Sequence, residues 1–361
     1  MPLPTRAARA DAPAAVLVVR LGAIGDVVRT LPAARLLRRT WPEARLGWAI
    51  EGAGASLLAG HPDVDELLVL PRGELAAAGR RLRPRALAVA LGFVRRLRSF
   101  GPNLSVDFQG SFKSGVVARL SGAARRVGFD RPHCREWSHV FANVRICLKE
   151  DRIHRVERAA RLACAAGAAD GPLEASLALS AAERSAGRGL VERLVARRPS
   201  VSLAPFSSPR QSWKRYPLEC WAEVARGLAE GGAGVVVLGG PGEEEASREV
   251  CQRAGAGAAP SGPIGLRELA SLIAATDLFV GGDTGPMHIA WSCGVPVIAV
   301  YGPTDPVINA PFGPGHVILA PEAPTGRHDA DPFPGISPDS ILSTARRRLG
   351  ELRTGFAEIP K

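Results

Sequence analysis

The chain has 361 residues, of which 46% are hydrophobic and 22% charged, and this balance indicates a folded protein rather than a disordered one. Its length exceeds the size at which one hydrophobic core usually keeps growing, so two domains are expected. No apolar run approaches the roughly 18 residues that span a bilayer, and the amino-terminal segment lacks the apolar stretch of a signal peptide. These features predict a cytoplasmic protein.

The net charge of +11 and the pI near 10.2 indicate a surface that attracts anions. A phosphorylated glycolipid, an acidic membrane face and a nucleic acid all fit this charge. A nucleic-acid partner is not expected, since aromatic residues make up only 5% of the chain and no nucleic-acid-binding motif is visible. The six cysteines include no Cys-x-x-Cys pair, which argues against a zinc site or a disulfide framework.

From residue 16 onward, short apolar runs alternate with longer helical stretches, a pattern typical of a parallel sheet with helices on its faces. In the first half, strands are predicted at 16–20, 46–50, 66–70 and 104–108, and helices at 27–39, 84–99 and 154–166. The Gly- and Pro-containing segment 168–180 predicts a linker, because Ser180 and Glu183 have the spacing of a capping box that starts a new helix.

A second alternating series follows the linker. Its strands are predicted at 201–205, 234–238, 278–281 and 295–301, and its helices at 218–230, 243–254, 266–275 and 286–293. The segment 321–337, rich in Pro, Gly and Asp, is predicted to be a loop, and Ser337-Pro338 to start the last helix. The fold class is therefore predicted as α/β with two doubly wound, Rossmann-like domains, at residues 1–170 and 171–361.

Asp26 follows a glycine-containing turn at the end of the first predicted strand, in VLVVRLGAIGDVVRTLPA. Such turns line the ligand crevice of open parallel sheets, and Gly22 and Gly25 allow close approach of the backbone. The spacing is not Gly-x-Gly-x-x-Gly, so a dinucleotide site is not favoured. Two interpretations of Asp26 remain open: a carboxylate that only favours a helix amino terminus, which the segment alone supports better, or a general base.

The segment DLFVGGDTGPMHIA predicts a diphosphate site in the second half. A strand ends in the turn Asp283-Thr284-Gly285, and the following short helix offers unpaired N–H groups to an anion. The Thr284 hydroxyl and the His288 ring add hydrogen-bond donors. The alternative is that Asp-Thr-Gly only caps the helix and that His288 packs in the core.

Two neighbouring loops carry further polar groups. The loop SSPRQSWKRYP clusters hydroxyls and cations after a strand, which suits phosphate oxygens as well as it suits a solvated basic loop. Lys214 stands out there because only four of the 46 basic residues are lysines. Of the three glutamates at 243–245, most are predicted to cap a helix, and Glu243, rather than Glu244, is predicted to accept ribose hydroxyls.

Together, the segments LGAIGDVVRTLPA, VDFQGSFKSG, HRVERAARLACAAG, SSPRQSWKRYP, VVLGGPGEEE, GGDTGPMHIA and YGPTDP follow one another as in a known family. From about Val16 to about Gly313 the chain resembles the ADP-heptose lipopolysaccharide heptosyltransferases, glycosyltransferase family 9. DTGPMH and YGPTDP are the most specific segments, and DFQGSFKSG is similar to the heptosyltransferase I type.

The resemblance implies a GT-B fold with a central cleft, an acceptor-binding amino-terminal domain and a nucleotide-sugar-binding carboxyl-terminal domain. It implies an inverting transferase that needs no metal and no cofactor, with ADP-heptose as donor and a lipid-linked saccharide as acceptor. The implied catalytic residues are Asp26 as base and Lys214 at the diphosphate. The predicted donor-binding residues are Gly22, Gly25, Ser207, Ser208, Glu243, Asp283, Thr284, Gly285 and His288. Departures at Ala204-Pro205-Phe206 and Lys214-Arg215-Tyr216-Pro217 leave the nucleotide base and the sugar open.

Basic residues elsewhere in the first half are candidates for acceptor charge. The predicted acceptor-binding residues are Lys113, Arg119, Arg125 and Arg126. The stretch 80–98 has arginines clustered at its ends; an ordinary amphipathic helix is favoured, with peripheral contact to an anionic inner membrane as the alternative. A monomer is expected. The rival functions are a nucleotide-sugar epimerase or hydrolase and a non-catalytic nucleotide-sugar-binding module.

Overall fold

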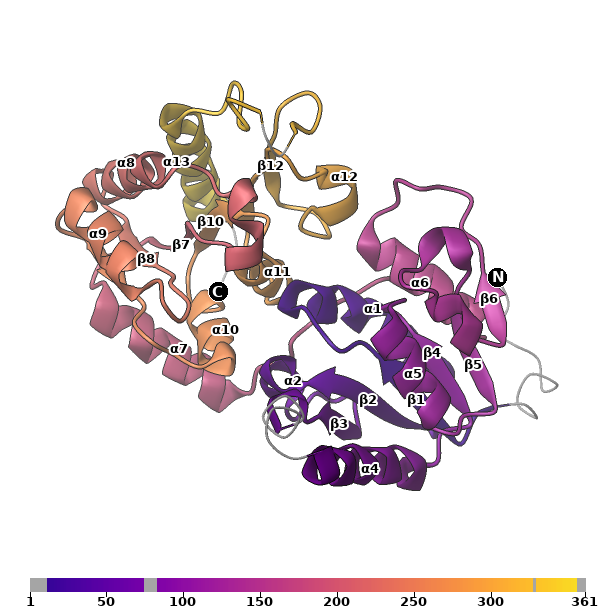
Figure 1. Ribbon diagram of the computed structural model, residues 1–361. Helices are drawn as coiled ribbons and strands as arrows, with labels where there is room; N and C mark the ends of the chain where they lie inside the picture. Colours follow the sequence, from indigo (N-terminus) through magenta and orange to yellow (C-terminus); the bar gives the residue numbers. More distant parts are fainter. Residues whose placement is uncertain (1–11, 75–82, 327–328, 356–361) are drawn as a thin grey trace. The chain divides into compact units, whose positions relative to one another are not determined.

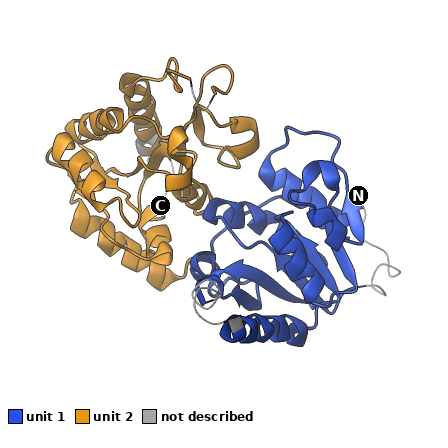
Figure 2. Cartoon of the chain, viewed as in Figure 1, with its two compact units in different colours: residues 1–177 blue, residues 178–361 orange. Residues whose placement is uncertain are grey.

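A computed structural model describes residues 12–74, 83–326 and 329–355. The chain divides into two compact units, Met1–Leu177 and Ala178–Lys361 (Figure 2). Residues 168–179 form neither helix nor strand, and Ser180 and Glu183 make the predicted capping box at the start of the next helix. In the described residues, no helix has both the length and the apolar character needed to cross a membrane.

Unit 1 is built on a six-stranded parallel sheet (Figure 1). The strands are β1 (Ala15–Val19), β2 (Arg45–Glu51), β3 (Glu66–Leu70), β4 (Leu104–Asp107), β5 (Arg125–Phe129) and β6 (Val144–Ile146). Their order is β3-β2-β1-β4-β5-β6, so the winding direction reverses between β1 and β4. In doubly wound sheets, ligands bind outside the carboxyl ends of the strands at this switch point.

Helices cover both faces of the first sheet. They are α1 (Ile24–Thr40), α2 (Gly52–Leu58), α4 (Arg83–Phe100), α5 (Phe112–Leu120) and α6 (Arg155–Ala165). Alternate residues of β1, such as Leu17 and Val19, pack in one cluster with α4 and α5, and α1 packs on α6. All five residues of β1 are buried, which explains its continuous apolar run.

Unit 2 repeats this topology. Its strands are β7 (Ser200–Ala204), β8 (Gly234–Val237), β9 (Ala258–Pro260), β10 (Leu278–Gly282), β11 (Val297–Val300) and β12 (Val317–Leu319). The parallel order β12-β11-β10-β7-β8-β9 is the order of unit 1 read from the other edge. Its switch point therefore lies between β7 and β10.

Seven α-helices accompany the second sheet in the described residues. They are α7 (Ala181–Leu194), α8 (Leu218–Glu230), α9 (Glu244–Ala254), α10 (Leu266–Ile273), α11 (Gly285–Ser292), α12 (Pro306–Asn309) and α13 (Pro338–Gly355). α8, α9 and α13 share one buried cluster with β7, β8, β10 and β11, and α10 contacts both α7 and α11.

The predicted α/β class with two doubly wound domains is confirmed. Every strand and helix predicted by range is present, with ends that differ by at most three residues. The last helix starts at Pro338 as predicted. The range predictions did not include β5, β6, β9 and β12, or the helices α2, α5 and α12.

Candidate active site

Asp26 lies in the first turn of α1, directly after the carboxyl end of β1. The side chain is 25% exposed, so it is neither turned into the interior nor fully solvated. The helix is capped at Ala23 without a side-chain hydrogen bond. As an acid in the first turn, Asp26 also suits the positive end of the helix dipole, so both interpretations of this residue stay open.

Two buried arginines hold the carboxylate of Asp26. Arg20, the residue that follows β1, forms an ion pair with Oδ2, and the Arg29 Nη2 atom lies 2.5 Å from Oδ1. Burial alone would raise the pKa of Asp26, but the two guanidinium groups outweigh burial and hold the pKa well below its usual range. Asp26 is thus ionised at any pH at which the protein is expected to work.

Further arginines surround this pair. Arg155 starts α6, and it interacts electrostatically with Asp26, Arg20, Arg29 and Arg135. Arg158, one turn later, is buried near Arg155, Arg20 and Arg135, and burial together with their repulsion lowers its pKa to about 10. Neither arginine was predicted as a site residue, although both lie in the segment HRVERAARLACAAG. The sequence indicates one of the ion pairs of Asp26: Arg29 follows three residues later on the predicted helix, a spacing that brings the two side chains together.

The segment that follows β4 supports the same region. Arg20 donates from Nη1 to the carbonyl of Phe108 at 2.9 Å, and the backbone N–H of Leu21 donates to Gln109 Oε1 at 2.8 Å. Asp107 is buried at the base of this turn, where it accepts hydrogen bonds from the Gln109 and Gly110 N–H groups and from the Ser114 hydroxyl. The DFQG segment therefore positions Arg20, and through it Asp26.

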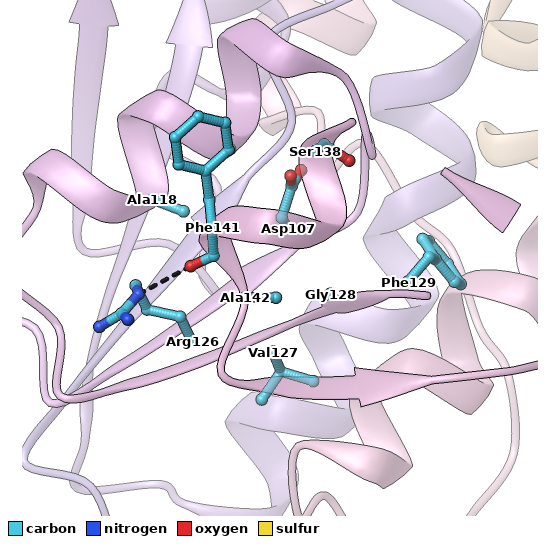
Figure 3. Close-up of a pocket in the computed structure, with 10 residues that line it drawn as sticks. Asp107, Ala118, Arg126, Val127, Gly128, Phe129, Ser138, Phe141 and Ala142 are labelled. Carbon is cyan, nitrogen blue, oxygen red and sulfur yellow. Dashed lines mark hydrogen bonds between the residues drawn. The ribbon is translucent and has the colours of Figure 1, made fainter. Parts of the chain in front are cut away.

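A small pocket lies next to Asp107, and Asp26 is not among its lining residues (Figure 3). Figure 3 shows the Arg126 guanidinium bonded to the carbonyl of Phe141, at 2.8 Å. The pocket is lined by Asp107, Gly115, Ala118, Arg126, Val127, Gly128, Phe129, Ser138, Phe141 and Ala142. Of the predicted site residues, it includes only Arg126, and it is too narrow to be a substrate site.

Burial raises the pKa of Asp107 from its usual 3.8 to about 6, although three hydrogen bonds and Arg20 oppose this. The fold thus favours the neutral carboxyl, whose contribution to stability is fully present below about pH 4 and is lost as the pH rises through about 6. We expect Asp107→Asn, which cannot ionise, to be stabilised relative to the parent by about 3 kcal/mol more at pH 7.5 than at pH 4. Urea unfolding at both pH values checks this, with the exposed Asp151→Asn as control. Equal differences at the two pH values would contradict it.

The predicted acceptor-binding residues lie at opposite ends of the strands of the first sheet. Lys113, in the first turn of α5, forms an ion pair with Glu51 at the end of β2, so both lie at the carboxyl edge with Asp26. Arg119 ends α5, while Arg125 and Arg126 start β5, which places all three at the opposite edge. The acceptor-binding role of all four residues stays a prediction. For Arg119, Arg125 and Arg126 it would require an acceptor that extends to the amino ends of the strands.

In unit 2, three predicted residues meet at the switch point between β7 and β10. Lys214 ends the 3-10 turn Pro209–Lys214 after β7, and its Nζ atom lies 3.4 Å from Asp283 Oδ2. The His288 Nε2 atom lies 3.7 Å from Asp283 Oδ1. The side chains are 10%, 11% and 3% exposed for Lys214, Asp283 and His288, so they form a mostly desolvated cluster.

The amino terminus of α11 adjoins this cluster. Thr284 is the N-cap residue and makes no side-chain capping bond, while Gly285 and Pro286 form the first turn. The Thr284 hydroxyl oxygen is buried and has no hydrogen-bond partner among the described residues. A buried hydroxyl without a partner costs free energy, and an anion at the helix amino terminus would supply the missing partner.

The loop after β7 also organises Glu243. Arg215 donates to Glu243 Oε1 at 2.8 Å, and the Gly240 N–H donates to Oε2 at 2.9 Å. Ser207 is buried, donates to the Gln211 carbonyl and accepts from Arg215, so it stabilises the loop, whereas Ser208 is exposed. Glu244 and Glu245 are exposed, whereas Glu243 is partly buried; that Glu243 accepts the ribose hydroxyls stays a prediction.

The sequence contains two Asp-x-Asp segments, at 63–65 and 329–331. Their carboxylates take part in local structure: Asp65 binds Arg38 and the Leu46 N–H, Asp329 accepts from the Gly326 N–H, and Asp331 accepts from the Phe333 N–H. Within the described ranges, no three His, Cys, Asp or Glu side chains come together as a group that would hold a metal ion.

Comparison with known proteins identifies the family of this chain. The family glycosyltransferase family 9 (heptosyltransferase) matches residues 91–329, which is more than half of the chain. Lipopolysaccharide heptosyltransferase 1 of Pseudomonas aeruginosa is 29% identical, with 86% of this chain and 84% of that protein aligned. Lipopolysaccharide heptosyltransferase 2 of Escherichia coli is also 29% identical, with 93% and 97% aligned, so identity does not separate the two types.

Solved structures agree at the level of the fold. The E. coli heptosyltransferase WaaC with ADP superposes with a TM-score of 0.76 at 22% identity, covering 92% of this chain and 99% of that one. E. coli ADP-heptose LPS heptosyltransferase II gives a TM-score of 0.75 at 23% identity, covering 93% and 98%. The predicted GT-B fold is thereby confirmed. The chain belongs to glycosyltransferase family 9, the heptosyltransferase family, and is a glycosyltransferase.

Proposed function

We propose that this enzyme transfers heptose from ADP-heptose to a lipopolysaccharide-core acceptor, with inversion at the anomeric carbon and without a metal ion. The observation that carries the proposal is the cluster of Lys214, Asp283 and the amino terminus of α11 at the switch point of unit 2. Its relatives are lipopolysaccharide heptosyltransferases, and one of them was solved with ADP and with ADP-2-deoxy-2-fluoro heptose. In this proposal unit 2 binds the donor and unit 1 the acceptor.

In the proposed reaction, Asp26 takes the proton of an acceptor hydroxyl while that oxygen attacks the anomeric carbon. The bond from this carbon to the diphosphate oxygen breaks on the opposite side, which inverts the configuration, and the electron pair leaves on ADP. Lys214 and the N–H groups of Thr284 and Gly285 stabilise the charge that develops on the leaving diphosphate. Glu243 accepts the ribose hydroxyls, and Gly22 and Gly25 leave room for the sugar; no protein atom lies within 4 Å of a Cβ built at Gly22.

The ion pairs of Asp26 weaken it as a base in the free enzyme. A base works best when its pKa lies near the operating pH, and two arginines hold that of Asp26 far lower. An acceptor with anionic groups would draw the arginines toward itself, which would raise the pKa of Asp26 only once the acceptor is bound. The arginine cluster around Asp26 suits the phosphates and carboxylates of such an acceptor.

We therefore expect Arg29→Gln to change the pH profile of kcat, which reports the groups of the enzyme with its substrates bound. Loss of one guanidinium raises the pKa of Asp26, so the acidic limb moves toward neutral pH by about one unit. The control is Arg39→Gln, an exposed arginine in the last turn of the same helix. Initial rates between pH 4.5 and 8 measure the shift; profiles that coincide for the variant and the parent would show that Arg29 does not act on the base.

The function itself is tested with ADP-heptose and a Kdo-containing lipid, by mass spectrometry of the product and NMR of the new anomeric centre. We expect a product heavier by one heptose, an inverted linkage and a rate that EDTA does not change. Incubation with donor alone is the decisive control. Turnover without acceptor would indicate a hydrolase or epimerase, and ADP binding without any turnover would indicate a binding module.

Contact with a membrane stays a prediction. On α4, Leu87 and Leu91 are 61% and 46% exposed, whereas Phe93 and Leu97 are buried against the sheet. The residues 80–82 of the predicted basic stretch lie outside the described residues. The monomeric state and the cytoplasmic location are proposals as well.

A further inference from the structure

Trp291 makes a buried contact with the donor-site histidine that the proposed reaction leaves unexplained. The indole Nε1 of Trp291 donates a hydrogen bond to His288 Nδ1 at 3.0 Å. The two residues are one turn apart on α11 and are 6% and 2% exposed. The contact is therefore shielded from water and held by the helix itself.

The chemistry of the two rings determines where the proton of His288 resides. An indole N–H is only a donor, so the Nδ1 atom that receives it must present a lone pair. In a neutral imidazole the proton then lies on Nε2, the nitrogen that is 3.7 Å from Asp283 Oδ1. A proton on Nδ1 would set two N–H groups against each other, so the contact disfavours both the other tautomer and the imidazolium.

We propose that Trp291 is a positioning residue that fixes His288 as the neutral Nε2–H tautomer, so that the ring presents a hydrogen-bond donor toward Asp283 and the diphosphate site. This inference rests on the proposed function for the identity of the diphosphate. Asp283 has Lys214 on its other oxygen, at 3.4 Å. When Lys214 turns to a bound diphosphate, the Nε2–H group still lies beside Asp283 Oδ1, at 3.7 Å, where a small movement would let it donate to the carboxylate.

A second ring supports the indole. Phe312 contacts Trp291 with its ring centroid 6.2 Å away and the planes at 61°. This edge contact supports the plane of the indole, and a phenyl ring offers no acceptor that competes with His288 for the Nε1–H group. Phe312 therefore provides a matched control: a change there disturbs the packing of Trp291 and keeps the hydrogen bond to His288.

The tautomer is measured on the free protein by two-bond ¹⁵N–¹H correlation NMR with ¹⁵N-histidine, and the His288 signals are assigned by their loss in His288→Gln. We expect an unprotonated Nδ1 and a protonated Nε2 in the parent and in Phe312→Leu. Trp291→Phe keeps an aromatic ring in the slot but has no N–H, so it should show both tautomers. A protonated Nδ1 in the parent overturns the proposal even if the variants at Trp291 and Phe312 do not fold.

Binding of ADP is the second measurement. We expect Trp291→Phe to raise the Kd for ADP about five- to tenfold, as for the loss of one hydrogen bond. The amide of His288→Gln offers an N–H near the Nε2 position whatever residue 291 is. In that background Trp291→Phe should therefore add little, whereas a purely structural role of Trp291 would give the same factor in both backgrounds and would refute the proposal. If the parent binds no ADP, the proposed function fails, while the tautomer measurement still decides the role of Trp291.

Discussion

Replacing Asp26 with asparagine should lower kcat by about a thousandfold, because the amide has the shape of the carboxylate but does not accept the proton of the acceptor hydroxyl. The affinity of the enzyme for ADP should stay unchanged, since the predicted donor residues that hold the diphosphate lie in the other unit. Initial rates with ADP-heptose and acceptor, together with calorimetric titration of ADP, measure the two effects. A variant that keeps more than a tenth of the parent kcat would exclude Asp26 as the base.

The same substitution removes the carboxylate that lies between Arg20 and Arg29, so a loss of stability accompanies it. The unfolding midpoint of Asp26→Asn therefore has to be measured, and rates have to be compared well below it. Asp26→Glu separates the two causes, because it keeps the negative charge and the ability to accept a proton. We expect it to recover most of the stability and part of the activity.

Replacing Lys214 with methionine should lower kcat/KM about a hundred- to a thousandfold and weaken ADP binding as well. The substitution keeps the unbranched apolar chain but removes the charge, and it leaves Asp283 without its Lys214 partner to repel the diphosphate. Lys214→Arg keeps the positive charge on a group of a different shape, the planar guanidinium, and should retain part of the affinity for ADP. Titration of ADP and steady-state rates give both quantities.

The chain offers a matched control, because it has only four lysines. Lys149 is exposed on the surface of unit 1. Lys149→Met therefore changes the net charge of the protein by the same amount as Lys214→Met. We expect it to behave as the parent does. If Lys214→Met bound ADP as tightly as Lys149→Met, then Lys214 would not contact the diphosphate.

The central strands were predictable from the sequence because both of their faces are buried. β1 and β7 are buried at every position and form continuous apolar runs. The strands that were not predicted lack a continuous apolar run. β6, β9 and β12 are three-residue edge strands with partly exposed residues, and β5 begins with two arginines. Their pairing depends on neighbours that are distant in sequence.

The candidate site was predicted in part for a similar reason. Lys214, Asp283 and His288 each follow a recognisable strand, and the neighbouring positions of β7 and β10 bring them together. Arg155 and Arg158 reach Asp26 only because α6 packs on α1, which no local pattern indicates. The hydrogen bond from Trp291 to His288 was not predicted either, because a Trp in an apolar helix is expected to pack in the core.

The division of the chain at a single point, between Leu177 and Ala178, has a consequence for engineering. Each sheet is formed by strands of one unit, and the residues of each of the two buried clusters described above belong to one unit. A hybrid that joins unit 1 of this chain to unit 2 of a relative would therefore interrupt no strand of either described sheet. Recombination at this junction is a route to pair one substrate preference with another.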